Sequence, residues 1–359
     1  MKRFLEFLRN DPLLILLVGL PLAVLAEFGH WGAVWVFAFS SLSVIPLAKL
    51  IGAGTEVLAA RTSPRIGGLL NATLGNAAEL IITIVAIREG LLELVKASIT
   101  GSILGNLLLV MGLSMVVGGV RHGVQKFDRR QASRNAILLV LAVLALVIPS
   151  LLSGYIGTPA SFRVEALSLG VAFVMIVLYG LALLYSLKAE GAPLAHTPVA
   201  EPAHIPRWST RSAFIVLGLA TLGVVVASEL LVGAVEPVVS AFGVSEFFLG
   251  IILIPLIGNV AEHLVAVQVA ARDQMDLSVE IAVSSSLQIA LFVAPVLVFI
   301  SLIFGHPLQL IFIDIELLAL IAGVLITAFV SEDGESNWLE GAELLTIYVI
   351  LALAFFLIR

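Results

Sequence analysis

Long apolar segments follow one another along almost the whole of this chain, and they limit its possible folds more than any other feature. About 20 apolar residues in a helix, at ~1.5 Å per residue, cross the hydrocarbon layer of a membrane. We expect eleven membrane helices, at residues 12–28, 31–51, 66–88, 92–119, 135–154, 164–187, 212–236, 246–271, 278–304, 309–330 and 338–357.

The composition supports this reading. Of the 359 residues, 60% are hydrophobic and 12% are charged, whereas soluble domains are about half apolar and about one quarter charged. A soluble core could not bury so many apolar side chains, so we predict an all-α polytopic membrane protein. The absence of cysteine excludes disulfides, thiolate zinc sites and cysteine nucleophiles. No basic tract indicates a nucleic-acid partner.

The basic residues predict the orientation, because Lys and Arg concentrate in cytoplasmic segments. With the N-terminus in the cytoplasm, all but four of the 19 Lys and Arg residues fall on the cytoplasmic side, the exceptions being Arg88, Lys96, Arg163 and Arg359. The C-terminus is then outside. Residues 1–11 are too short for a transit peptide, and the first apolar window shows no cleavage site. These features favour a prokaryotic cytoplasmic membrane.

A proline-rich segment at 188–210 divides the chain. It contains four prolines, so a regular helix is excluded and a semi-rigid cytoplasmic linker is expected. We therefore predict an N-terminal transmembrane helix within 1–30, a first five-helix repeat at 31–187 and a second five-helix repeat at 211–359.

A repeated motif lies in the third and eighth expected helices. LLNATLGNAAEL (69–80) matches part of GIILIPLIGNVAEHL (250–264), so that Asn76 and Glu79 correspond to Asn259 and Glu262 at a constant offset of 183. The helices are five spans apart, and this odd separation makes the copies antiparallel. Inverted repeats of this kind are typical of secondary transporters, which bind their substrate between the repeats near mid-membrane.

The motif places an amide and a carboxylate on one helix face, since Asn76 and Asn259 each precede a glutamate by three residues. Glu79 and Glu262 are expected deep in the hydrocarbon, where a carboxylate costs roughly 2.5–3.5 kcal/mol. A single such glutamate can serve as a structural hydrogen-bonding group. Two of them in matched, opposed motifs favour an ion site instead.

Further candidate residues flank this motif. TGSILGNLLLV (100–110) is similar to VSSSLQIALFV (283–293), which pairs Ser102 with Ser284 and Asn106 with Gln288 when one residue is skipped. We expect these side chains and Ser285 to line the site. His263 and Glu229, which we expect to be buried, are candidate proton-coupling groups. In contrast, Glu316 lies near the end of an expected span, together with Glu56, Glu236 and Asp314, and we expect it to be solvated.

The ligand set contains only oxygen, which suits Ca²⁺ with its 6–8 oxygen ligands. Two ionised glutamates balance one Ca²⁺, and two protons balance the same pair equally well. Without the ion, repulsion and desolvation favour protonation. Competition between Ca²⁺ and H⁺ for one site is the basis of an antiporter, so we predict exchange of the two ions by alternating access, with no cofactor. Other divalent cations and a homo-oligomer remain open.

These segments resemble a known family. GGLLNATLGNAAEL (67–80) and PLIGNVAEH (255–263) are similar to the two alpha repeats of the Ca²⁺/H⁺ exchangers in the calcium/cation antiporter superfamily, as are IPLAKLIGAGTE (45–56), SELLVGAVE (228–236) and SSSLQIALFV (284–293). The resemblance implies one helix plus two inverted five-helix repeats, with Ca²⁺ bound by Glu79 and Glu262. It departs from the family in segment 188–210, where an acidic helix is common but only Glu190 and Glu201 occur.

Three other functions remain open. A Na⁺-coupled or mixed monovalent/divalent cation antiporter of the same superfamily is the nearest, although Asn stands where Na⁺-coupled relatives usually carry Ser. A passive cation channel would lack coupled, saturable exchange. A membrane-embedded enzyme has little support, because the sequence shows no HExxH motif, no nucleophile with a base and no phosphate-binding loop.

Overall fold

The computed structural model describes residues 11–62, 64–158, 161–186 and 208–358, and these form helices joined by short connections. In the first half the elements are η1 (Pro12–Val18), α2 (Gly19–Phe28), α3 (Ala33–Ala59), α4 (Pro64–Leu74), α5 (Ala77–Arg88), α6 (Leu92–Leu104), η2 (Gly105–Val110), α7 (Met111–His122), β1 (Gln125–Lys126), α8 (Arg129–Ile156) and α9 (Phe162–Ser186). In the second half they are α10 (Thr210–Gly233), α11 (Val235–Phe242), α12 (Glu246–Phe248), η3 (Leu249–Leu253), α13 (Ile254–Ala270), α14 (Met275–Gln288), η4 (Ile289–Val293), α15 (Ala294–Ile303), α16 (Asp314–Val330), β2 (Glu335–Ser336) and α17 (Trp338–Leu357).

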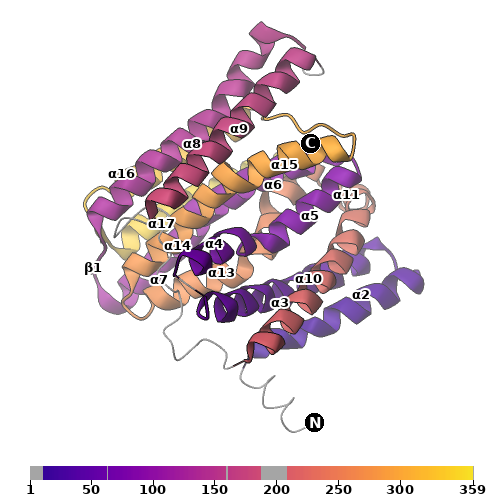
Figure 1. The fold of residues 1–359 in the computed structure, drawn as a ribbon, viewed down its shortest axis with the longest axis horizontal. Coiled ribbons are helices and arrows are strands. Elements are labelled where there is room, and N and C mark those ends of the chain that lie inside the picture. Colours follow the sequence, from indigo (N-terminus) through magenta and orange to yellow (C-terminus); the bar gives the residue numbers. More distant parts are fainter. Residues whose placement is uncertain (1–10, 63, 159–160, 187–207, 359) are drawn as a thin grey trace.

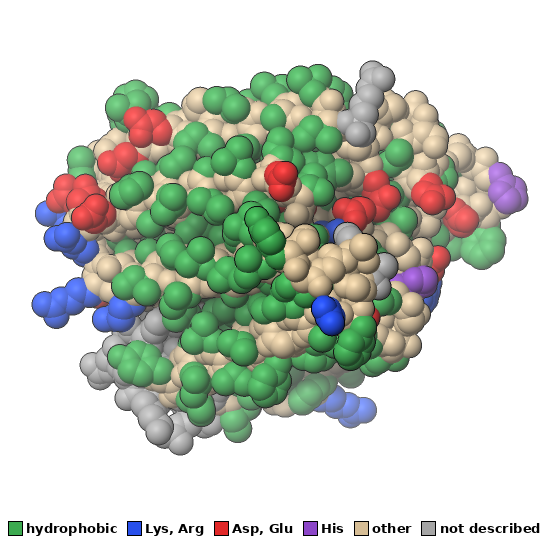
Figure 2. Space-filling view, turned by 90° about the horizontal axis from the view of Figure 1, so that it is seen from above, with side chains coloured by type: hydrophobic (Ala, Val, Ile, Leu, Met, Phe, Trp, Pro, Cys, Tyr) green, Lys and Arg blue, Asp and Glu red, His purple; other side chains and the backbone are tan. Residues whose placement is uncertain are grey.

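Helical segments long and apolar enough to cross a membrane number eight among the described residues. The apolar stretch Pro12–Phe28 and helix α16, at 17 residues, are shorter. Apolar side chains spread across much of the face in Figure 2, and a group of Lys and Arg side chains lies at its left edge. Exposed apolar side chains on this scale require lipid as the surrounding solvent, as the sequence predicts.

The helices form two flanks around a central group (Figure 1). On one flank α3 packs against α10 and α2, and on the other α8 packs against α9 and α16. The helices that carry the repeated motif, α4, α5 and α13, lie between these flanks with α6 and α14. A two-stranded antiparallel sheet, in which Gln125 pairs with Ser336, joins the connection before α8 to the one before α17.

Local sequence explains several helix boundaries. The side chain of Asp128 caps α8 by accepting hydrogen bonds from the amides of Arg130 at 2.7 Å and Gln131 at 3.1 Å. These hydrogen bonds, the one from Gln131 first, hold the pKa of Asp128 below its ordinary value. Pro46 lies inside α3 and Pro149 inside α8, where each removes one backbone hydrogen bond.

The two motif helices differ, which corrects the expectation of one helix at 66–88. The chain ends α4 at Leu74 and restarts α5 at Ala77, with a turn at Gly75 and Asn76. In the second half α13 continues through Gly258 and Asn259, and a π-helical segment, η3, precedes it. Gly and Asn both weaken a helix interior, so the motif permits a break without requiring one.

Helix α6 crosses η3 with the two backbones in contact. A Cβ atom added to Gly101 would overlap the carbonyl oxygen of Ile251, and one added to Gly250 would lie 2.8 Å from the carbonyl oxygen of Leu94. The two glycines therefore allow a close approach that larger residues would prevent. This crossing fixes Ser102, the next residue on α6, relative to the second half of the chain.

The expected linker at 188–210 lies outside the described residues except for its last three positions. Residues 1–10 of the expected N-terminal unit also lie outside the described residues.

Candidate functional site

Glu79 lies in the first turn of α5 and is buried, with 4% of its surface exposed. Its Oε1 atom accepts a hydrogen bond from the Ser102 hydroxyl at 2.7 Å and another from the Asn259 side-chain amide. These partners come from α6 and α13. One carboxylate oxygen therefore joins three helices and both halves of the chain.

Glu262 on α13 has the corresponding contact in the second half. Its Oε2 atom accepts a hydrogen bond from the Ser285 hydroxyl on α14 at 2.8 Å. Ser102 follows Glu79 by 23 residues and Ser285 follows Glu262 by 23 residues. The pairing of Ser102 with Ser284 is therefore wrong, because no residue is skipped. The Ser284 hydroxyl instead donates to the Ile281 carbonyl of its own helix at 3.4 Å.

The two motif asparagines reach across to the opposite half. Besides its bond to Glu79, the Asn259 amide lies 3.3 Å from the Ser102 hydroxyl oxygen. Asn76 donates to the Gln288 side-chain oxygen on α14 at 2.6 Å. Asn106, expected to be the counterpart of Gln288, is buried in η2. At the offset of 183 that the two serine contacts follow, Gln288 corresponds to Gly105 and not to Asn106.

Each motif glycine lies beside the glutamate of the other motif. A Cβ atom on Gly258 would lie 3.0 Å from the Glu79 Cγ atom, and one on Gly75 would lie 3.7 Å from the Glu262 Oε1 atom. The two copies of the motif therefore pack against each other around one centre. The environments of the two carboxylates differ, since Glu79 is fully buried and Glu262 is partly exposed.

Two buried oxygen atoms at this centre accept no hydrogen bond within the described part of the chain: Glu79 Oε2 and Asn76 Oδ1. Leaving such groups unpaired costs about 1–3 kcal/mol each. Carboxylate and amide oxygens are ligands that a hard cation prefers. No group of three His, Cys, Asp or Glu residues that could hold a metal occurs among the described residues. A cation at this centre would therefore need amide and hydroxyl oxygens beside the two glutamates.

Of the two candidate proton-coupling groups, His263 lies at this centre and Glu229 lies away from it. His263, next to Glu262, is buried, and its Nε2 atom has no hydrogen-bond partner among the described residues. Contrary to the expectation from the sequence, Glu229 is not buried. Its side chain is 37% exposed and forms a bidentate ion pair with Arg88 at the end of α5. It therefore joins α10 to α5 away from the motif centre.

The expectation of a solvated Glu316 is also wrong. Glu316 is 1% exposed, and its Oε1 atom accepts a hydrogen bond from the Thr100 hydroxyl at 3.0 Å. A signal was present in the sequence, since a glutamate in the third helical position commonly reaches back to the amide before the helix. Here Glu316 Oε2 accepts from the Ile313 amide at 3.0 Å.

Comparison with known proteins identifies the family of this chain. The profile of the sodium/calcium exchanger protein family matches residues 32–188 and again residues 212–357. The chain belongs to this family. It is 44% identical to the Ca²⁺/H⁺ antiporter ChaA of Bacillus subtilis (strain 168) over 348 residues, which cover 96% of this chain and 98% of that protein.

Two solved structures share the exchanger fold of this chain. The native structure of YfkE matches with a TM-score of 0.84 and 43% identity, covering 96% of this chain and all of that one. A structure titled as the H⁺/Ca²⁺ exchanger CAX matches with a TM-score of 0.72, covering 97% of this chain and 92% of that one. Its identity is 16%, so it supports the fold alone.

Proposed function

We propose that this protein is a secondary active antiporter that exchanges Ca²⁺ for H⁺ by alternating access. The observation that carries the proposal is that two glutamates from matched motifs converge. Each accepts a hydrogen bond from a serine, and the two serines are separated by the same offset of 183 as the two glutamates. Relatives that cover nearly the whole chain are named Ca²⁺/H⁺ antiporters, in Bacillus subtilis and in Synechocystis.

Charge balance explains why the two ions compete. Ionised Glu79 and Glu262 together neutralise one Ca²⁺, and the same pair is neutral when each carries a proton. An empty, doubly charged site is costly in a low-dielectric interior. The site therefore crosses between the two sides of the membrane either with Ca²⁺ or with protons, which couples the two fluxes.

We assign the remaining ligands from the contacts at the centre. The Ser102 and Ser285 hydroxyls and the Asn259 amide each donate a hydrogen bond to a motif glutamate. When Ca²⁺ binds, these groups can turn their oxygen atoms toward the ion, and Asn76 and Gln288 can do the same. Together with two carboxylates they supply the 6–8 oxygen atoms that Ca²⁺ takes. His263 is the proposed proton acceptor beside Glu262.

Eleven spans, arranged as one N-terminal helix and two inverted five-helix repeats, account best for the motif geometry. The family profile matches twice, on either side of segment 189–211. Each motif glycine also lies against the glutamate of the other motif. The proposed repeats are residues 31–187 and 211–359, with the N-terminus in the cytoplasm and the C-terminus outside.

Na⁺ coupling is the alternative to test, because the family also contains Na⁺/Ca²⁺ exchangers. Purified protein in sealed liposomes should accumulate Ca²⁺ when a pH gradient alone is imposed. A Na⁺ gradient at equal pH on both sides should give no accumulation. Ca²⁺ uptake that follows the Na⁺ gradient and ignores the pH gradient would contradict the proposal.

A further inference from the structure

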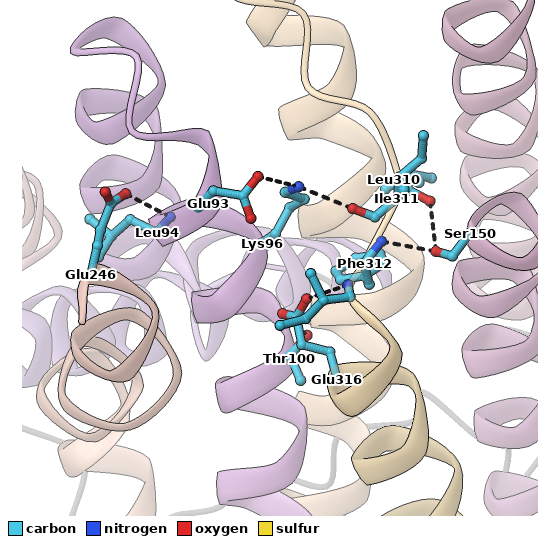
Figure 3. Close-up of polar contacts among 11 residues, drawn as sticks. Glu93, Leu94, Lys96, Thr100, Ser150, Glu246, Leu310, Ile311, Phe312 and Glu316 are labelled. Atoms are coloured by element: carbon cyan, nitrogen blue, oxygen red, sulfur yellow. Dashed lines mark hydrogen bonds and ion pairs between the residues drawn. The ribbon is translucent and has the colours of Figure 1, made fainter. Parts of the chain in front are cut away.

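A third carboxylate is buried outside the proposed ion site. Glu316 stands in the first turn of α16, and Figure 3 shows it pointing toward Thr100 on α6. Its two oxygens accept hydrogen bonds from the Thr100 hydroxyl and the Ile313 amide, each at 3.0 Å. Among the described residues it has no ion-pair partner within 4.0 Å. A buried carboxylate held by only two donors is a strong candidate for a functional role.

The nearest cation is held in another direction. Lys96, one turn before Thr100 on α6, pairs with Glu93 at 2.7 Å and donates to the Ile311 carbonyl at 3.1 Å (Figure 3). Ile311 belongs to the non-helical segment 305–313 that leads into α16. The amides of Leu310 and Phe312 in this segment donate to the Ser168 and Ser150 hydroxyls of α9 and α8. The start of α16 is thus fixed, and Glu316 is presented to α6 from a rigid support.

Helix α6 carries both carboxylate contacts on opposite faces. Thr100 and Ser102 are two residues apart, which places their side chains about 200° apart around a helix with 3.6 residues per turn. One hydroxyl bonds Glu316, and the other bonds Glu79 of the proposed site. At the offset of 183 the counterpart of Thr100 is Val283, which has no hydroxyl. The arrangement therefore belongs to α6 and is not repeated in α14.

We propose that Glu316 is a positioning residue whose ionisation controls the placement of Ser102 against Glu79. When ionised, Glu316 accepts a strong charge-assisted hydrogen bond from Thr100 and fastens α6 to α16. When protonated, it loses the charge that strengthens this bond, and α6 is held less firmly. Protons would then weaken Ca²⁺ binding at a second point, beside their competition at Glu79 and Glu262. This inference rests on the proposed function.

Few other charges act on Glu316. Glu93 and Lys96 face it from α6, while Asp314 of its own helix and His306 of the preceding segment are exposed. Helix η2 contains no ionisable residue. The charged residues of α8 lie in its first two turns, and those of α17 lie at Glu340 and Glu343. These turns pack near the far end of α16, so they contribute little to the titration of Glu316.

The test is Ca²⁺ binding to the purified full-length protein, measured with radioactive Ca²⁺ between pH 6 and pH 8.5. In Glu316→Gln, which is permanently neutral, we expect affinity at pH 8 to fall about tenfold and to change less with pH than in the wild type. The two curves should approach each other at low pH. Glu246→Gln is the matched control, because Glu246 of α12 also accepts a hydrogen bond from α6, from the Leu94 amide at 3.1 Å. It should bind as the wild type does.

Thr100 variants test the same contact without changing a charge. Thr100→Ser retains the hydroxyl and should keep wild-type binding, whereas Thr100→Val should weaken Ca²⁺ binding most at high pH. A loss of equal size at every pH in Glu316→Gln and Thr100→Val would indicate a purely structural contact and overturn the inference, as would unchanged binding. If Glu316→Gln does not fold, the Thr100 pair decides. If wild-type binding does not depend on pH at all, the proposed function fails instead.

Discussion

Ser102 and Ser285 hold the two motif glutamates in matching ways, because each donates a hydroxyl hydrogen bond to the glutamate of its own half. A hydrogen bond to a charged group contributes about 1.5–3 kcal/mol, and 1.4 kcal/mol corresponds to about a tenfold change in affinity. In the proposed mechanism the same hydroxyl oxygen becomes a Ca²⁺ ligand. Its removal should therefore weaken Ca²⁺ binding without abolishing it.

Ser102→Ala and Ser285→Ala are each expected to weaken Ca²⁺ binding about tenfold. The measurement is equilibrium Ca²⁺ binding to the purified variants at pH 8. Ser284→Ala is the control, because the Ser284 hydroxyl bonds a carbonyl of its own helix. An effect of Ser284→Ala as large as that of Ser285→Ala would mean that the serine register described above does not govern binding.

At this scale the sequence predicts which motifs matter but not which side chains meet. The spacing of Asn76, Glu79, Asn259 and Glu262 is visible in the chain, and the structure brings all four together. The choice between Ser284 and Ser285 depends on helix rotation, which one skipped residue changes by about 100°. Glu229 and Glu316 were misplaced because distance from a span end does not determine burial. Neighbouring segments do, as segment 305–313 does for Glu316.

Among the helices, the crossing of α6 with η3 positions the site most directly. Gly101 lies against the Ile251 carbonyl, immediately before the serine that bonds Glu79. A methyl group there would force α6 and η3 apart. Overpacking of a tight contact costs about 1–3 kcal/mol, and more where the backbone itself is blocked.

Gly101→Ala should therefore lower the thermal unfolding temperature in detergent by several degrees and weaken Ca²⁺ binding. Gly105→Ala is a matched control about one helical turn later, because a Cβ atom added there would have no neighbouring atom within 4 Å. It should leave the unfolding temperature unchanged or raise it, because Ala favours a helix more than Gly does. Equal losses in both variants would show that the crossing is not the cause.

Element boundaries were only partly predictable. The long apolar windows agree with the long helices because burial in lipid and helix length follow from the same residues. The break at Gly75 and Asn76 was not predicted, since the same Gly-Asn pair lies inside a continuous helix at Gly258 and Asn259. The difference arises from packing around each motif and not from the motif itself.

On the scale of the whole molecule, the proposal requires the two motif helices to run in opposite directions through the membrane. The chain contains no cysteine, so single cysteines can report which side each connection faces. Glu89 directly follows α5, and the exposed Arg272 closely follows α13. These two positions should lie on opposite sides.

With a membrane-impermeant maleimide and intact cells, Glu89→Cys should be labelled directly, and Arg272→Cys only after the membrane is opened. The cysteine-free wild type is the control for background labelling. Labelling of both positions from the same side would exclude the antiparallel arrangement and, with it, the inverted repeat.

The central claim is that one pair of glutamates serves both Ca²⁺ and protons, and proton-driven Ca²⁺ uptake into sealed liposomes tests it most directly. The comparison is between the wild type, Glu79→Gln, Glu262→Gln and the exposed-site control Glu236→Gln. A pH gradient alone should drive uptake by the wild type and the control, and uptake by either motif variant should fall at least 100-fold although both remain folded. Full exchange by Glu79→Gln or by Glu262→Gln would contradict the paired-glutamate mechanism.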